Sequence, residues 1–165
     1  MLLSHQAQFG CNSRSPRTLF DNYKGSILLV GEGDFGFANM LSKNMKHEGN
    51  ITATTFAANL EFLQDTFPQA KENIKELESI GASIQYKIDA TDTSNLKPTS
   101  KLYDTICFNF PHRNGKSNIK YNRQLLKDFL LNAKKYLNKN GQVNVMLVRS
   151  QSGLYSKSST EFKQS

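Results

Sequence analysis

The chain has 165 residues, of which 38% are hydrophobic and 21% charged. This composition suits one globular domain and excludes a disordered or collagenous chain. No run approaches the roughly 18 consecutive apolar residues that a membrane-spanning helix needs, so we expect no membrane partner. The two cysteines, Cys11 and Cys107, exclude a disulfide framework and a cysteine-based zinc site, and we expect no bound metal.

The net charge of +7 is concentrated in the last third of the chain. Between His112 and Arg149 there are nine lysine and arginine residues and one acid, Asp128, so this segment carries +8 and the rest of the chain −1. A basic balance of this size favours a polyanionic partner. Any nucleic-acid surface is therefore expected in this segment.

The two ends of the chain lack sustained hydrophobic periodicity. Residues 1–24 are expected to form a flexible tail, and their Ser- and Arg-bearing start, with no acid before Asp21, is also compatible with weak mitochondrial targeting. Residues 150–165 contain six serines and are expected to form a second loose tail. The sequence thus predicts one domain over residues 25–149.

Within this domain, short apolar runs alternate with segments of helical spacing. The expected strands are residues 26–30, 51–56, 82–88, 103–108 and 142–148. The expected helices are residues 35–46, a short helix that starts near Leu60, a longer one that starts at Pro68, and residues 119–137. Residues 91–101 form a polar connection. This alternation predicts a three-layer α/β sandwich around a mainly parallel sheet.

A glycine-rich turn, Gly31-Glu-Gly-Asp-Phe-Gly36, follows the first expected strand. Glycine lets a ligand approach the backbone, and the spacing matches the dinucleotide-binding pattern. However, no acid for the ribose follows the second strand, where the chain reads Phe-Ala-Ala-Asn over 56–59. Glu32 and Asp34 would also flank a pyrophosphate, which favours a cationic or hydroxyl-rich ligand such as S-adenosylmethionine over NAD. A tight turn without a ligand is the alternative.

A second candidate site follows the fourth expected strand. The side-chain amide of Asn109 fits the edge of a nucleobase, and Phe110 with Pro111 could form a stacking wall for an unpaired base. His112 titrates near neutrality and could move a proton. The alternative is a strand end followed by a surface histidine.

A basic surface is predicted beside this second site. Four of its residues lie on the expected helix and fall within roughly a 60° arc at 100° per residue. Phosphate contacts from such a stripe would position RNA without reading its sequence, whereas an ordinary solvated face is the alternative. The residues of the basic surface are Arg113, Lys116, Lys120, Arg123, Lys127 and Lys134.

A resemblance to a known family is carried by residues 27–35, 89–91, 108–112 with 115–116, and 122–126. In these residues the chain resembles the family of large-subunit rRNA (uridine-N3) methyltransferases. The resemblance covers about residues 26–149. It implies a Rossmann-like methyltransferase domain, S-adenosylmethionine as cofactor and ribosomal RNA as substrate. It also implies a nucleolar or nuclear location, with the cytoplasm as the alternative.

The resemblance also implies roles for single residues. Asp89 would accept a hydrogen bond from the adenine amino group, and His112 would assist the loss of the uridine N3 proton. The residues that would cradle the methionine and ribose portions are Gly31, Glu32, Gly33, Asp34 and Phe35. The residues that would line the methyl-transfer site are Asn109, Phe110, Pro111 and His112.

The chain departs from the family pattern at several positions. Ala57 stands where an Asp is usual, and Gly36 stands where a Ser is usual. After Val148 the family continues through a lysine, a Pro-Tyr pair and a tryptophan, whereas this chain reads Arg149-Ser-Gln-Ser-Gly153 and has no tryptophan. The last strands of the methyltransferase sheet are therefore expected to be missing. These departures favour the alternative of a catalytically degenerate RNA-binding or partner-binding module on the same fold.

Overall fold

The computed structural model describes residues 23–45, 50–99, 102–111 and 118–147. In this part of the chain, strands and helices alternate as the apolar runs predict. The elements in chain order are β1 (Ile27–Val30), α1 (Gly36–Asn44), β2 (Ile51–Thr54), α2 (Leu60–Thr66), α3 (Ala70–Ser79), β3 (Ser83–Gln85), β4 (Tyr103–Asn109), α4 (Ile119–Ala133) and β5 (Leu137–Met146).

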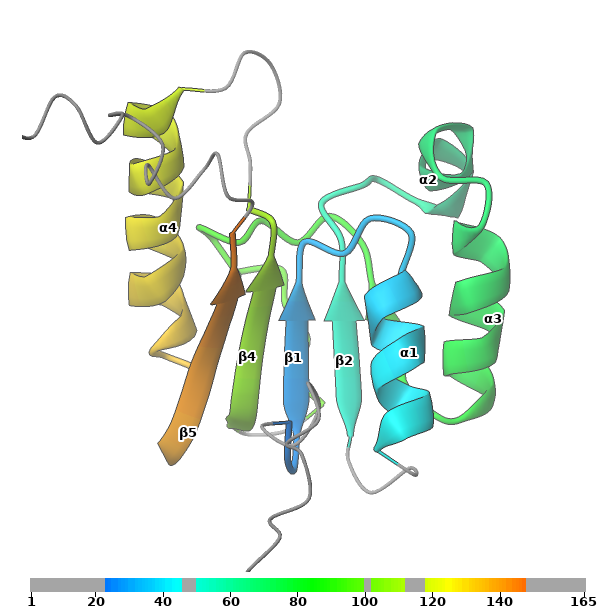
Figure 1. Ribbon diagram of the computed structural model, residues 1–165, viewed down its shortest axis with the longest axis horizontal. Helices are drawn as coiled ribbons and strands as arrows, with labels where there is room; N and C mark the ends of the chain where they lie inside the picture. Colours follow the sequence, from blue (N-terminus) through cyan, green and yellow to red (C-terminus); the bar gives the residue numbers. More distant parts are fainter. Residues whose placement is uncertain (1–22, 46–49, 100–101, 112–117, 148–165) are drawn as a thin grey trace, which may run out of the picture.

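The five strands form one sheet in the order β3-β2-β1-β4-β5, and every neighbouring pair is parallel. Figure 1 shows β2, β1, β4 and β5 side by side with their arrows pointing the same way. The chain moves outward from β1 through β2 to β3, then returns to the other side of β1 to form β4. This reversal places a topological switch point between β1 and β4. In open α/β sheets, ligands bind at such a point, beside the carboxyl ends of the strands.

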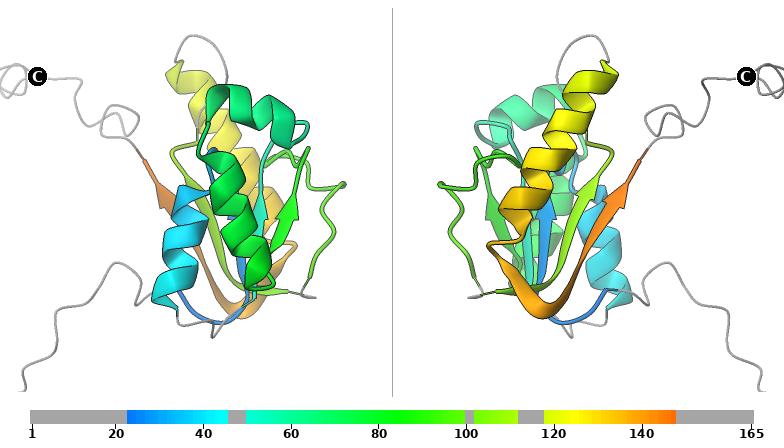
Figure 2. Two further views of the ribbon diagram at one scale, coloured as in Figure 1. Left: turned by 90° about the vertical axis from the view of Figure 1, so that its right-hand side faces the viewer. Right: turned by 90° about the vertical axis from the view of Figure 1, so that its left-hand side faces the viewer.

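The alternating side chains of β1 build a separate core on each face of the sheet. Ile27 and Leu29 pack in one core with α1, α2 and α3, whereas Leu28 and Val30 pack in the other with α4. The two views of Figure 2 show α3 in front in one and α4 in front in the other. The predicted three-layer, Rossmann-like sandwich with a parallel sheet is confirmed.

The junction between the last helix and the last strand differs from the sequence prediction. The last helix ends at Ala133 rather than at residue 137, and the last strand begins at Leu137 rather than at residue 142. The N–H of Tyr103 donates to the Tyr136 carbonyl (2.7 Å), which brings the chain beside β4 immediately after the helix. Tyr136 and Leu137 are partly buried and pack against the core on the α4 side of the sheet, although they lie beyond the end of the helix.

The third strand is shorter than predicted, because Lys87 has a left-handed backbone (φ 58°) and its N–H donates to the Ala57 carbonyl (2.9 Å). The outer side of β3 is also occupied. The side-chain amide of Gln85 donates to the Lys97 carbonyl (2.6 Å) and accepts from the Lys97 N–H (2.8 Å). The polar connection after β3 is therefore fastened to the edge of the sheet.

Candidate functional site

Three loops meet at the carboxyl edge of the sheet, which is the upper edge in Figure 1. They are residues 31–35 after β1, residues 55–59 after β2 and residues 109–111 at the end of β4. Because the strands are parallel, their carboxyl ends lie at one edge, and the predicted cofactor turn and transfer site lie on either side of the switch point.

The glycine-rich turn needs glycine for two separate reasons. Gly31 has a left-handed backbone (φ +72°), and a Cβ there would lie 2.5 Å from the Phe108 ring. A Cβ at Gly33 would lie 3.2 Å from the Phe67 ring, which leaves little space for a side chain. Phe35 has φ 60° and is fully buried, so its ring anchors the turn from below.

Glu32 lies beneath the turn rather than on its surface. Its side chain is 7% exposed, its N–H donates to the Thr54 carbonyl (2.8 Å), and its carboxylate accepts from the Ala38 N–H (3.3 Å). Burial raises the pKa of Glu32 to about 7, the bond from Ala38 opposes this shift, and the charge of Asp34 adds to it. A buried carboxylate at a helix N-terminus offers the turn a negative charge that a cationic ligand would stabilise.

Asp34 is exposed, and its carboxylate accepts from the Gly36 N–H (2.9 Å) at the start of α1. The two acids of the turn thus both bind N–H groups of the first turn of α1. This use of the carboxylates fixes the shape of the turn.

Asp89 lies on the same side of the switch point as β2 and β3. Its Oδ1 accepts from both the N–H and the hydroxyl of Thr91 (2.8 Å each). Just before it, the Ile88 N–H donates to the Thr55 carbonyl (3.0 Å), which joins the loops after β2 and β3. Ala57 is half-buried in the α1-side core. Its methyl group can make none of the ribose hydrogen bonds that an aspartate would make there.

Asn109 and Phe110 form the far side of the switch point. Asn109 ends β4 opposite Met146, and the Phe110 N–H donates to the Met146 carbonyl (2.7 Å). Phe110 has φ 51° and is 47% exposed, whereas Pro111 is buried. A left-handed backbone at a non-glycine residue costs about 1–2 kcal/mol. The hydrogen bond to β5 helps to hold Phe110 in this conformation, which leaves its ring exposed. His112, Arg113 and Lys116 lie outside the described residues.

Lys120, Arg123 and Lys127 are exposed on α4, opposite buried Phe129 and Ala133. Lys134 is also exposed, but it lies just after the last residue of the helix, not within the helix as expected. The acid of this segment, Asp128, lies outside their arc and accepts from the Gln124 amide (2.7 Å). In the part of the chain that the structure describes, no acid forms an ion pair with this stripe. Its members are Lys120, Arg123, Lys127 and Lys134.

Cys107 offers no nucleophile to the site. The thiol lies on β4 and is 1% exposed, and burial raises its pKa to about 11, so it stays protonated at neutral pH. In the described ranges, no three His, Cys, Asp or Glu side chains lie close enough to hold a metal ion. Among the helices described, none is long and apolar enough to cross a membrane.

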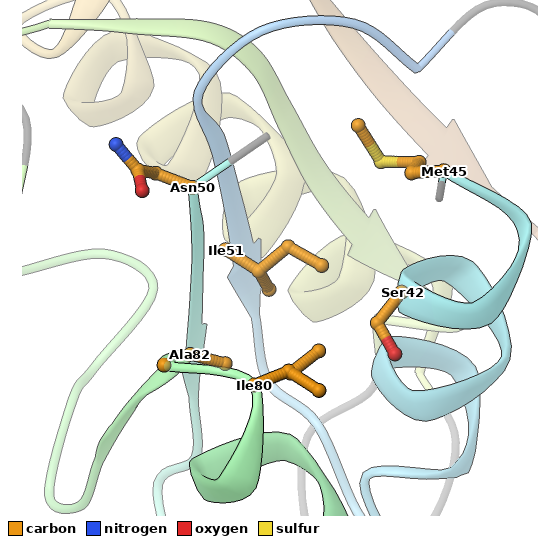
Figure 3. A pocket seen from close by; sticks show the side chains of 7 residues that line it. Ser42, Met45, Asn50, Ile51, Ile80 and Ala82 are labelled. Atoms are coloured by element: carbon orange, nitrogen blue, oxygen red, sulfur yellow. The ribbon is translucent and has the colours of Figure 1, made fainter. Parts of the chain in front are cut away.

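A small pocket lies at the opposite edge of the sheet, between the end of α1, the start of β2 and the end of α3 (Figure 3). Its volume of ≈ 30 Å³ is far below the roughly 300–1,000 Å³ of typical cofactor pockets. This pocket is therefore too small to hold a cofactor. The pocket is lined by Ser42, Met45, Asn50, Ile51, Ile80, Gly81 and Ala82.

The carboxyl edge of the sheet combines a glycine-rich turn before α1, an acid after β3 and Asn109-Phe110-Pro111 at the end of β4. Residues 28–164 match the family described as rRNA (uridine-N3-)-methyltransferase, BMT5-like. The chain belongs to this family. The resemblance read from the sequence motifs is thereby confirmed, and the match includes every residue predicted for the site.

Comparison with individual proteins gives partial matches. The chain is 38% identical over 128 residues to the Ferredoxin-fold anticodon-binding domain-containing protein 1 homolog of Mus musculus, covering 77% of the chain and 20% of that protein. It is 27% identical over 140 residues to the 25S rRNA (uridine(2634)-N(3))-methyltransferase of Saccharomyces cerevisiae, covering 68% of the chain and 41% of that protein. The chain thus spans about a fifth of the mouse relative.

Among solved structures, the chain is similar to the plantazolicin methyltransferase BpumL, crystallised with a triazolic desmethylPZN analog and SAH. The identity is 22% and the TM-score 0.43, and the match covers 83% of this chain and 45% of that chain.

Proposed function

We propose that this chain is a methyltransferase domain that uses S-adenosylmethionine and acts on N3 of a uridine in ribosomal RNA. The observation that carries the proposal is the glycine-rich turn of residues 31–35 at the switch point of a parallel sheet, in a chain of the BMT5-like family. The yeast relative named as a 25S rRNA (uridine(2634)-N(3))-methyltransferase supports the substrate class. A nucleolar location is part of the same proposal.

The residues at the edge fit this cofactor in shape and charge. Gly31 and Gly33 have no side chains, and the rings of Phe108 and Phe67 lie close to where a Cβ at these two positions would be. The backbone of the turn is therefore open to a ligand. The carboxylates of Glu32 and Asp34 complement a sulfonium and an ammonium group, whereas they would repel the pyrophosphate of NAD. Asp89 would accept a hydrogen bond from the adenine amino group.

The chemistry then needs positioning and the removal of one proton. When bound, S-adenosylmethionine would supply an electrophilic methyl group, and its sulfur would keep the electron pair of the broken carbon–sulfur bond. Phe110 and Asn109 would hold the base in line, since in-line displacement depends mainly on orientation. The N3 proton would pass to His112, whose ordinary pKa range suits a base at neutral pH.

A second candidate function follows from Ala57. Without an acid after β2, one ribose contact is missing, which favours a catalytically degenerate module that binds RNA or a protein partner on the same fold. The two candidates differ in one measurable property, which is the affinity for the methyl donor.

Calorimetric titration of the full chain with S-adenosylmethionine and, separately, with NAD tests the proposal. We expect saturable binding of S-adenosylmethionine and none of NAD, because the turn presents two carboxylates to the ligand. Binding of neither would favour the degenerate module, and binding of NAD alone would overturn the assignment of the cofactor.

The basic surface on α4 predicts RNA binding that weakens steeply with salt. In an Arg123→Ala/Lys127→Ala variant, the slope of log K against log salt should become shallower by about 1.4, since each single-strand phosphate contact contributes roughly 0.7. Filter binding of a uridine-containing RNA at several salt concentrations measures this slope. The matched control is Lys71→Ala/Lys75→Ala, two exposed lysines on α3. Equal slopes in the two variants would remove α4 from the RNA surface.

A further inference from the structure

Helix α3 is fastened to the glycine-rich turn by the side-chain amide of Asn73. Its Nδ2 donates to the main-chain carbonyl of Asp34 (2.9 Å), 39 residues earlier in the chain. Its Oδ1 accepts from Nδ2 of Asn39 (3.1 Å), which lies on α1 and is 7% exposed. One side chain thus joins the turn, the helix that follows it and the helix packed against both.

The orientation of the Asn73 amide is set by a chain of donors and acceptors. Lys43 can only donate, and it donates to the carboxylate of Glu76 (2.7 Å). That carboxylate can only accept, so Asn39, which also bonds to it, must present its NH₂ group there. The same NH₂ group donates to Oδ1 of Asn73. Nδ2 of Asn73 is therefore the atom that faces the carbonyl of Asp34, and a flipped amide would place two oxygens together.

The bond from Asn73 complements the bonds made by the acids of the turn. Glu32 and Asp34 bind N–H groups of α1, so they hold the turn to its own helix. Asn73 holds the turn from the neighbouring helix. A second contact acts in the same direction, because the ring of Phe67, which follows α2, lies within 3.2–3.6 Å of the place where a Cβ on Gly33 would be.

We infer that Asn73 is a positioning residue for the methyl donor. By fixing the carbonyl of Asp34, it holds the turn of residues 31–35 in the shape that binds S-adenosylmethionine. This inference rests on the proposed function. None of the residues predicted for the site lies on α3. The inference nevertheless gives this helix control over the affinity for the cofactor.

The test is Asn73→Asp in the full chain. This isosteric change keeps an acceptor for Asn39 and replaces the donor that faces Asp34 with an oxygen. We expect the Kd and KM for S-adenosylmethionine to rise about tenfold, the size of one lost hydrogen bond, while kcat changes less than twofold. Asn44→Asp is the matched control, since Asn44 donates to the Met40 carbonyl within its own helix (2.8 Å) and should leave the Kd unchanged.

A second readout needs no methyl donor. Amide hydrogen exchange of residues 34–38 should be about tenfold faster in Asn73→Asp than in wild type, with β4 unchanged. Asn73→Ser, which adds no charge, should show the same changes if the aspartate variant does not fold. Wild-type affinity and wild-type exchange in either folded variant would overturn the inference. A wild-type chain that binds no donor would instead refute the proposed function, and the exchange rates would still decide the role of Asn73.

Discussion

A Gly31→Ala variant should lose about 3 kcal/mol of unfolding free energy and all measurable binding of S-adenosylmethionine. The left-handed backbone at this position (φ +72°) costs an alanine about 1–2 kcal/mol. The new Cβ would also lie 2.5 Å from the Phe108 ring, which packs edge-on against Phe129 with 5.0 Å between ring centroids and has little room to move. Overpacking of this kind adds about 1–3 kcal/mol. Urea unfolding and calorimetry measure the two losses.

Gly81→Ala separates the two causes. Gly81 follows α3 and has a similar backbone (φ +82°), but a Cβ there would meet nothing within 4 Å. This variant should lose about 1–2 kcal/mol and bind the methyl donor normally. If Gly31→Ala were no less stable than Gly81→Ala, the contact with Phe108 would not be the reason for glycine in the turn.

The second large effect is a dependence of stability on pH that comes from Glu32. Burial raises the pKa of its carboxyl from 4.5 to about 7, so between these values the folded chain holds a proton that the unfolded chain releases. The contribution of Glu32 to the free energy of unfolding is fully present below pH 4.5 and falls as the pH rises to about 7. Above that pH the contribution is lost and no longer changes with pH. At about 1.4 kcal/mol per pH unit, the total is about 3 kcal/mol.

Glu32→Gln should remove this dependence. The amide can still accept from the Ala38 N–H but carries no buried charge. We expect the unfolding free energy of the variant, compared with that of wild type, to be about 3 kcal/mol more favourable at pH 8 than at pH 4.5. Urea unfolding of both proteins at the two pH values gives the difference. Glu72→Gln, at an exposed position on α3, is the control and should change neither value. A pH-independent difference for Glu32→Gln would mean that the Glu32 carboxyl has the same pKa in the folded and unfolded chains.

Most of the fold could be predicted because its strands and helices follow from local patterns, namely short apolar runs and apolar residues at helical spacing. The predicted strand over residues 26–30 lies between Gly25 and Gly31, and its four apolar residues, Ile27–Val30, are all buried. The boundary between α4 and β5 could not be predicted in this way. Tyr136 and Leu137 have the right spacing for the apolar face of the helix, but the bond between Tyr103 and Tyr136 starts the strand there.

The candidate site was predicted in part for the same reason. The glycines and acids of the turn are adjacent in sequence, so the pattern reveals them. The contacts that make the turn specific are long-range, and they involve residues of ordinary type. The rings of Phe108 and Phe67 lie close to where a Cβ on Gly31 or Gly33 would be, and Asn73 donates to the carbonyl of Asp34. No local signal marks a phenylalanine on β4 or an asparagine on α3 as part of the site.

The amide of Gln85 has a consequence for how the sheet can grow. By offering one donor and one acceptor to Lys97, it imitates the pairing that another strand would make, so a strand arriving at β3 would first have to displace the connection. At the other edge, among the residues described, β5 pairs with β4 alone, and one row of its main-chain groups faces away from the sheet. Additional strands, from this chain or another, can therefore extend the sheet in one direction, away from β3 and along β5.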